Sequence, residues 1–336
     1  MRDKVSLKDI AEKLGVSVKT VSGALNGDTI RMSAETRKRI RELAEELGYK
    51  PNVVARGMRQ GVMPVIGLVA EGLITLPFAT EIVRALDNAA HGFGLSVVAT
   101  NVSASRGAQD GIADAQRFLP KAIVYATMFH RNITLDPVVR RAVQLTINCA
   151  EESGKIPAIV PDEFQAAYDI VEHCFAKGRR HIAFLNLPGI LAGSLREEGF
   201  RAAHAARDLP VNNTWILPAT RGAHYTEFSA SLVSHHIDAL MSGAAQPDTI
   251  LCGNDRVALE VSNVLRRKRI EIPNDVALVS FDNQAEIARR LDPPLTTMAL
   301  PHREMGRRAA EIIAGIKPAG EKIERIPFRL IERASV

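Results

Sequence analysis

A short helix, a tight turn and a second short helix occupy the first 27 residues, and this pattern constrains the fold more than any other. Ser6 is placed to cap the first helix, and Asp9, three residues later, completes a capping box. Gly15 breaks that helix, and Ser17 is placed to cap the next one. Two short helices joined by a turn with glycine predict a helix-turn-helix, the unit that places its second helix in the major groove of DNA. The apolar side chains expected to face inward are Ile10, Ala11, Leu14, Val21 and Leu25.

The positive charge of the chain is concentrated in the same region. Residues 1–62 contain 13 Lys and Arg against 8 Asp and Glu, a net charge of +5, and the whole chain also carries +5. The rest of the chain is therefore neutral overall. Contact with the phosphates of nucleic acid requires such a concentration of positive charge. The alternative interpretation, a small solvated helical cap on a larger domain, leaves the agreement of cap, turn and charge unexplained.

A third helix and a short segment follow the helix-turn-helix. Ser33 is placed to cap a helix whose apolar residues repeat at helical spacing up to Leu47, and Gly48 ends it. Pro51 then starts a segment, up to about residue 61, that is too short and too rich in glycine to form a stable isolated helix. Such a segment can order only when it meets DNA.

From residue 63 onward, apolar runs typical of buried parallel strands alternate with amphipathic stretches. This alternation predicts βαβ units on parallel sheets that are covered on both faces. Roughly 270 residues are too many for one such sheet, so we expect an α/β domain of two lobes. The predicted strands are 65–70, 95–100, 121–127, 145–149, 181–186, 248–253 and 276–281, and clear helical stretches are 81–91, 165–176 and 256–267.

Composition and missing motifs exclude several classes of protein. The three cysteines are scattered without a CxxC pair, so neither a disulfide framework nor a zinc site is expected, and no cofactor is expected either. The chain begins with a charged, capped helix, which does not resemble a signal peptide. We therefore expect a cytoplasmic protein with no membrane partner. The sequence contains no GxxxxGK and no GxSxG, and an enzyme is not expected.

Two stretches, VSLKDIAEKLGVSVKTVSGALNG at 5–27 and SAETRKRIRELAEELGYKPNVVAR at 33–56, match a known family almost residue for residue. On these residues the chain resembles the LacI/GalR family of bacterial transcription regulators. Weaker matches continue along the chain: PF at 77–78, GRRHIAF at 178–184, LREEGF at 195–200, CGNDRVAL at 252–259, IPNDVALVSFDN at 272–283 and PPLTT at 293–297. The resemblance implies a homodimer or tetramer that binds a pseudo-palindromic DNA operator.

The resemblance also implies a domain plan. It gives a helix-turn-helix head at 1–50, a hinge helix at 51–62, and an effector and dimerisation domain at 63–336. That domain has two Rossmann-like lobes of the periplasmic-binding-protein type. The first lobe is expected at about 63–161 and 292–320, and the second at about 162–291 and 321–336.

The expected DNA contacts lie on the second helix and in the hinge. By resemblance, positions 18, 19 and 23 determine which bases are recognised. Lys19 can donate a hydrogen bond to guanine, or it can contact only a phosphate. Gly23 replaces the usual Arg, so one base contact is expected to be lost. Met58 occupies the place of a leucine that wedges into a base step, and it could instead contact the dimer mate. The full set expected at DNA is Ser6, Leu7, Ser17, Val18, Lys19, Thr20, Ser22, Gly23, Asn26, Asn52, Ala55, Arg56 and Met58.

The expected effector contacts follow predicted strands, at the edge of an open α/β sheet where ligands bind. Arg196 lies early in a predicted helix, and its guanidinium group can donate hydrogen bonds to two sugar hydroxyls at once. Phe78 can stack on a sugar face. By resemblance, Asn148, Arg196, Asn254 and Asp282 contact the effector, whereas Asp255 is favoured as a helix cap. The family usually has Asp-Asn near position 162, where this chain has Asp162-Glu163, and Leu76 replaces an Asn. The resemblance therefore does not say whether these positions contact an effector.

These observations predict a DNA-binding transcription repressor of carbohydrate uptake or catabolism genes, controlled by a small sugar or sugar derivative. A repressor of the same architecture that responds to a purine or nucleoside is the first alternative. A solute-binding protein for sugar transport is the alternative from another class, and the basic head argues against it. The sequence leaves open whether the effector releases DNA or promotes its binding.

Overall fold

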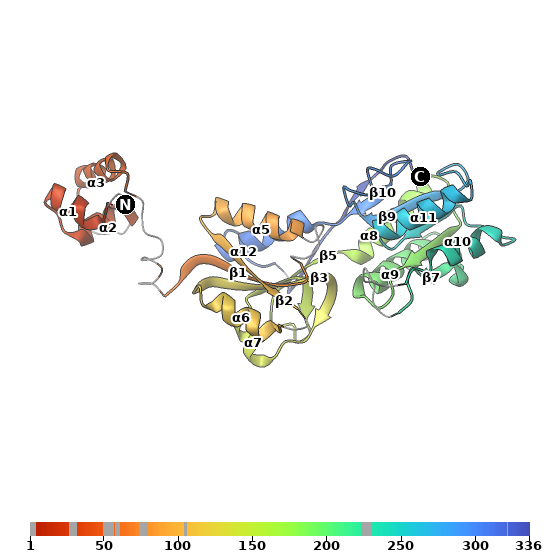
Figure 1. Cartoon of the computed structure of the whole chain (residues 1–336), viewed down its shortest axis with the longest axis horizontal. Coiled ribbons are helices and arrows are strands. Elements are labelled where there is room, and N and C mark those ends of the chain that lie inside the picture. Colours follow the sequence, from red (N-terminus) through yellow and green to blue (C-terminus); the bar gives the residue numbers. More distant parts are fainter. Residues whose placement is uncertain are drawn as a thin grey trace. The chain divides into compact units, whose positions relative to one another are not determined.

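A computed structural model of the chain divides into two compact units, residues 1–63 and residues 64–336 (Figure 1). The structure describes residues 5–26, 32–49, 57, 61–73, 80–103, 106–222, 230–320 and 322–336.

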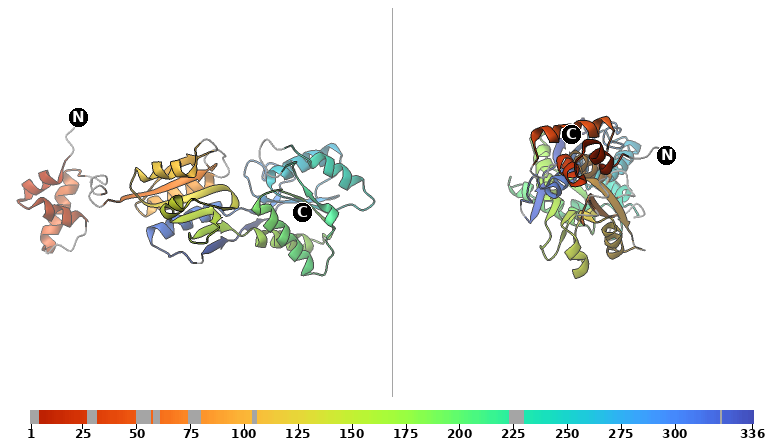
Figure 2. Two further views of the ribbon diagram at one scale, coloured as in Figure 1. Left: turned by 90° about the horizontal axis from the view of Figure 1, so that it is seen from below. Right: turned by 90° about the vertical axis from the view of Figure 1, so that its left-hand side faces the viewer.

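The described part of the first unit contains the helices α1 (Leu7–Leu14), α2 (Val18–Asn26) and α3 (Ala34–Glu46), which pack together (Figure 2). The predicted capping box at α1 is confirmed: Ser6 accepts a hydrogen bond from the backbone of Asp9, whose side chain accepts one from the backbone of Ser6. Gly15 ends α1 with a φ of 65°, a left-handed conformation that costs glycine little. The buried core is small and joins all three helices through Ile10, Ala11, Val21, Ala24, Ile40 and Ala44.

The first lobe of the second unit is built on a six-stranded sheet in the order β11-β5-β4-β3-β1-β2. Helices α5 and α12 share one buried cluster with the sheet, and α6 and α7 share another. The strands are β1 (Met63–Glu71), β2 (Ser96–Val102), β3 (Pro120–Ile133), β4 (Leu145–Glu151), β5 (Ala158–Pro161) and β11 (Ile323–Ile326). The helices are α5 (Thr80–Gly92), α6 (Ala108–Gln116), α7 (Pro137–Ala142) and α12 (His302–Ala314).

The second lobe has a six-stranded sheet in the order β12-β10-β9-β8-β6-β7, in which β12 runs antiparallel to β10. Helices α10 and α11 pack in one cluster, and α8 and α9 in another. The strands are β6 (Ile182–Asn186), β7 (Ile216–Pro218), β8 (Thr249–Cys252), β9 (Ala277–Asp282), β10 (Thr296–Ala299) and β12 (Arg329–Ile331). The helices are α8 (Glu163–Ala176), α9 (Leu191–Ala205), α10 (Val233–Ser242) and α11 (Asp255–Arg267), with a 3-10 turn at Asn213–Trp215.

The seven predicted strands and three predicted helices are confirmed, but two segments lie in the other lobe from the one expected. Residues 292–299 were expected in the first lobe, yet β10 pairs with β9 in the second sheet. Residues 321–326 were expected in the second lobe, yet β11 pairs with β5 in the first. Both strands have only four residues and therefore carry little sequence signal, so the sheet that each one joins is decided by tertiary pairing.

None of the helices in the described part of the chain is long and apolar enough to span a membrane.

Candidate functional site

The start of α2 presents an exposed surface of the head. Val18 and Lys19 are exposed there, and the apolar side chain of Val18 is 44 % exposed. Ser17 caps the helix: its Oγ accepts a hydrogen bond from the backbone N–H of Thr20 at 3.0 Å. An exposed valine and lysine on the first turn of a capped helix are suited to a thymine methyl and a guanine edge.

The other expected DNA contacts of the head differ in exposure. Ser6 is exposed, whereas Leu7 and Ser22 are half-buried. Gly23 is buried and has no side chain, so the position one helical turn after Lys19 offers no side-chain contact. Asn26 is the last residue of α2. Five further expected residues, Asn52, Ala55, Arg56, Met58 and Phe78, lie outside the described residues.

In the second unit, Arg196 lies in the first half of α9, and its buried side chain contacts several other residues. Its side chain is 3 % exposed, its Nε donates to Glu163 Oε2 at 2.6 Å, and its Nη1 donates to the carbonyl oxygen of Gly253. The guanidinium also lies 4.3 Å from the ring centroid of Phe281, a cation–π distance. Helices α8 and α9 approach so closely that a Cβ at Gly199 would lie 2.1 Å from the carbonyl oxygen of Phe164. This close packing holds Arg196 beside Glu163.

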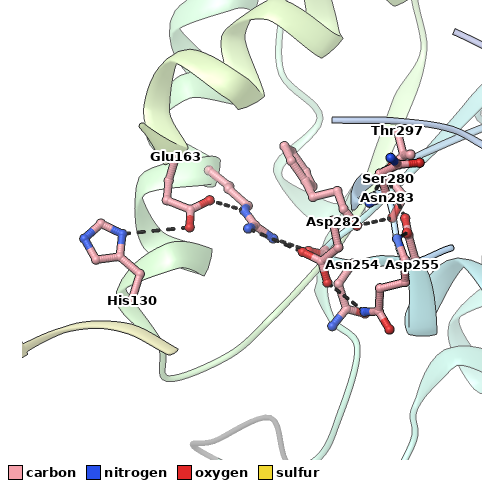
Figure 3. A network of polar contacts seen from close by, with 12 residues as sticks. His130, Glu163, Asn254, Asp255, Ser280, Asp282, Asn283 and Thr297 are labelled. Atoms are coloured by element: carbon pink, nitrogen blue, oxygen red, sulfur yellow. Dashed lines mark hydrogen bonds and ion pairs between the residues drawn. The ribbon is translucent and has the colours of Figure 1, made fainter. Parts of the chain in front are cut away.

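Glu163 connects Arg196 to the first lobe (Figure 3). Its side chain is 2 % exposed, and its Oε1 lies 3.8 Å from Nδ1 of His130, at the far end of β3. That distance is too long for a hydrogen bond but short enough for an electrostatic contact. Burial by itself raises the pKa of Glu163, but Arg196 and His130 outweigh burial, so the pKa is lowered. Glu163 is therefore an ionised carboxylate between the two lobes.

Asp282 and Asp255 form a second acidic group at the ends of neighbouring strands. Asp282 ends β9, 4.0 Å from Nη2 of Arg196, and accepts a hydrogen bond from Gln284 Nε2 at 2.9 Å. Asp255 accepts from the backbone of Gln284 at 2.6 Å and from Thr297 Oγ1 at 2.9 Å. Burial raises the pKa of Asp255 to about 7 and that of Asp282 to about 6. The negative charge of Asp282 further raises the pKa of Asp255, and that of Glu163 further raises the pKa of Asp282.

The structure corrects the roles expected for two neighbouring residues on α11. Asn254, and not Asp255, is the N-cap: its Oδ1 accepts a hydrogen bond from the backbone of Val257 at 3.0 Å. Asp255 had been favoured as the cap, but it is fully buried and bonds to Gln284 and Thr297 instead. Helix capping therefore gives Oδ1 of Asn254 one structural partner, and the contact of Asn254 with an effector stays a prediction.

Asn148 has a structural task at the end of β4. Its Nδ2 donates to the carbonyl oxygens of Thr127 at 3.0 Å and Met128 at 2.9 Å. These carbonyls lie where the pairing of β3 with β4 shifts register, between Ala126 and Arg131. Asn148 therefore stabilises the irregular part of β3, which contains His130.

The backbone is unusual at the same strand ends. Asn148 has a φ of 60°, Asp282 of 106° and Asn283 of 55°. Positive φ in residues other than glycine costs on the order of 1–3 kcal/mol and concentrates at ligand sites. The strain marks these strand ends as candidate binding positions. Among the described residues, no group of His, Cys, Asp and Glu side chains could hold a metal ion.

Comparisons with known proteins agree with this architecture. Residues 6–52 match the family described as "Bacterial regulatory proteins, lacI family", and residues 171–336 match the "Periplasmic binding protein-like domain". The chain is 36 % identical over 341 residues to the sucrose operon repressors of Escherichia coli and Shigella flexneri, covering 98 % of this chain and 99 % of each relative. The chain belongs to the lacI family.

Solved structures of this family share the fold. A transcriptional regulator assigned to the lacI family, from Rhizobium etli, is 27 % identical with a TM-score of 0.73, and the match covers 81 % of this chain and 98 % of that one. The lac repressor dimer bound to operator and an anti-inducer is 24 % identical with a TM-score of 0.69, covering 99 % of both chains. The head and the two-lobed α/β domain of this lacI-family chain are thus confirmed.

In this lacI-family chain, sequence reasoning missed His130 and left Glu163 open. The apolar run that predicted β3 ends at residue 127, whereas the strand continues to Ile133 and carries His130 toward α8. A polar extension of a strand has no hydrophobic periodicity, so no signal in the sequence identified it. The structure brings together Arg196, Asp282 and Asn254 with these two residues.

Proposed function

We propose that this protein is a repressor of carbohydrate uptake or catabolism genes, controlled by a small saccharide bound in the second unit. The observation that carries the proposal is the 36 % identity, over nearly the whole length, to sucrose operon repressors. The lacI-family head makes it a sequence-specific DNA-binding regulator. Because operator DNA lies in the bacterial cytoplasm, we infer that the protein acts there.

On the DNA side, we infer a homodimer on a pseudo-palindromic operator. One head can read only a half-site, and two joined heads gain affinity by simultaneous engagement. A candidate contact surface is the edge of the first sheet, because β2 is an edge strand beside α5 and an unpaired edge invites pairing. A hollow of about 500 Å³ lies there, lined by Thr80, Val83, Arg84, Asp87, Val97 and Ala99.

On the effector side, the polar contacts at Arg196 support a role for lobe movement. Glu163 and Arg196 belong to the second lobe, and His130 belongs to the first. An effector that forms hydrogen bonds with Arg196, Glu163 or His130 would change the contacts that join the two lobes. A change in lobe angle alters the spacing of the two heads and hence their joint affinity for DNA.

The test is operator binding with and without sugars. An operator is selected from random duplexes with the full-length protein, and binding is followed by fluorescence anisotropy while sucrose, other sugars and purines are added. We expect a sugar to shift operator affinity, and Asp282→Asn to weaken that shift while operator binding without sugar persists. A shift with a purine base and with no sugar would contradict the proposal.

A matched control for Asp282→Asn is Asp169→Asn, which changes the same chemical group at an exposed position of α8. Its side chain accepts a hydrogen bond from Nε2 of Gln165, one helical turn away, at 2.7 Å. We expect this control to respond to sugar as the unchanged protein does.

A further inference from the structure

Arg196 is the only buried lysine or arginine among the described residues, and its charge is already compensated inside the protein. Glu163 accepts from its Nε at 2.6 Å, and Asp282 lies 4.0 Å from its Nη2. A buried cation is stable only when it is paired and hydrogen-bonded, so Glu163 accounts for how this guanidinium can be buried.

Two carboxyl groups balance the charge of Arg196: Glu163 pairs with it directly, and Asp282 lies 4.0 Å from its Nη2. Among the other cations near these acids, Arg333 acts on Asp255 and already donates to Asn283 and to the carbonyl oxygen of Leu295. Arg256 also acts on Asp282, but it is partly exposed to solvent, which screens its effect. An anionic ligand would therefore approach a group of residues without an uncompensated cation.

Two buried polar atoms beside this group lack a hydrogen-bond partner within the described part of the chain. They are Nδ1 of His130 and Oδ1 of Asn148, on adjoining strands β3 and β4. The Nδ2 of Asn148 is engaged with two carbonyl oxygens, so its free atom is an acceptor that needs a donor. A hydroxyl group offers a donor and an acceptor, whereas an ionised phosphate offers acceptors only.

We propose that Glu163, by neutralising Arg196 within the protein, makes the effector site selective for uncharged saccharides over phosphorylated ones. This inference rests on the proposed function and narrows it to one chemical class of effector. Glu163 acts here as a specificity determinant: its negative charge repels a phosphate group, and its bond to Arg196 removes the cation that would attract one. A neutral polyol meets no such penalty and supplies the hydroxyl donors that Asn148 lacks.

The test compares sugar pairs that differ only by a phosphate group. Isothermal titration calorimetry on the full-length protein uses sucrose against sucrose 6-phosphate, fructose against fructose 1-phosphate and glucose against glucose 6-phosphate. For any pair that binds, we expect the neutral member to bind at least about tenfold more tightly. A unit charge a few ångströms away at an effective dielectric near 20 has an effect of this order or larger.

The variant Glu163→Gln keeps the shape and removes the charge. We expect the preference for the neutral sugar to fall about tenfold, because the guanidinium becomes available to phosphate. Glu172→Gln is the matched control, since Glu172 lies on the same helix and pairs with Arg207 on the surface at 2.6 Å. We expect this control to keep the preference of the unchanged protein, and circular dichroism melting checks that both variants are folded.

The outcomes separate this inference from the proposed function. Tighter binding of the phosphorylated member by the unchanged protein would overturn the inference and leave the carbohydrate repressor intact. So would an unchanged preference in a folded Glu163→Gln variant. If no sugar or sugar phosphate binds a protein that still binds operator, the proposed function fails and the inference fails with it.

Discussion

The residue that most strongly links the interior of this protein to its candidate site is Arg196. It is 3 % exposed and pairs with a Glu163 that is 2 % exposed. Breaking a buried pair by removing one partner leaves the other charge uncompensated, which costs more than the pair itself contributes. Arg196 is thus required for packing at α8 and α9 as well as for any contact with an effector.

Arg196→Ala is expected to lower the free energy of unfolding by about 3–5 kcal/mol, because Glu163 remains buried and ionised without its partner. Adding Glu163→Gln to this variant should recover part of the lost stability, because the unpaired buried charge of Glu163 is then removed. Urea denaturation of the single and double variants measures both effects. A single-variant loss below about 1 kcal/mol would show that water reaches Glu163 and that the pair is not truly buried.

The buried acids predict a pH dependence of stability. The pKa of Asp255 is raised in the folded protein to about 7, so its contribution is fully present below its unfolded pKa and is lost as pH rises toward 7. Between pH 5 and pH 8, the unchanged protein should therefore lose about 3 kcal/mol of stability relative to Asp255→Asn. Denaturation of both proteins at the two pH values gives the difference. A difference that is the same at both pH values contradicts the raised pKa.

Substitution of Lys19 tests whether the head recognises bases through this side chain. Lys19→Ala should relax the preference at one base pair by about 1–3 kcal/mol if the side chain contacts a guanine. The control Lys38→Ala removes the same charge from exposed α3 and should weaken binding evenly across sequences. Binding to a library of operator variants distinguishes them, and an even loss with Lys19→Ala would assign that side chain to a phosphate.

At the scale of elements, α2 and α3 begin with the same local structure. The Oγ atoms of Ser17 and Ser33 each accept a backbone hydrogen bond at 3.0 Å, from Thr20 and Thr36 respectively. Each serine also lies 2.8 Å from the hydroxyl of that threonine. The two caps are therefore matched in geometry, although only α2 carries the expected base contacts.

Ser17→Ala and Ser33→Ala should each destabilise the head by about 1 kcal/mol through loss of a cap. Only Ser17→Ala should also reduce operator affinity beyond what the stability loss explains, because it frays the first turn that holds Val18 and Lys19. Thermal melting of residues 1–62 and operator titration of the full-length variants separate the two effects. Equal operator affinities in the two variants would remove the first turn of α2 from the DNA interface.

At the scale of the whole molecule, the protein consists of two separate compact units, residues 1–63 and 64–336. The net charge of +5 belongs to residues 1–62, and the remainder is neutral overall. Electrostatic attraction to DNA is therefore expected to reside in the first unit, while the second is expected to provide dimerisation and the response to effector.

Residues 1–62 in isolation should bind DNA weakly and with a strong dependence on salt, because affinity comes mainly from phosphate contacts by one head. The full-length protein should bind its operator at least about 100-fold more tightly, as expected when two heads engage together. Titrations at several salt concentrations give both quantities. Equal operator affinity of the fragment and the full chain would contradict binding as a dimer.

The head, the alternation of strands and helices, and the strand ends with polar residues could all be predicted from the amino-acid sequence. These features follow from local rules: caps, a glycine turn and periodic apolar residues act within a few positions of one another. The tertiary structure alone assigned β10 and β11 to their sheets, made Asn254 the cap of α11, and extended β3 to His130. It also placed Glu163 against Arg196, 33 positions apart along the chain. Contacts of this kind depend on how distant segments pack, and burial then sets the charge of each group, so no local pattern encodes them.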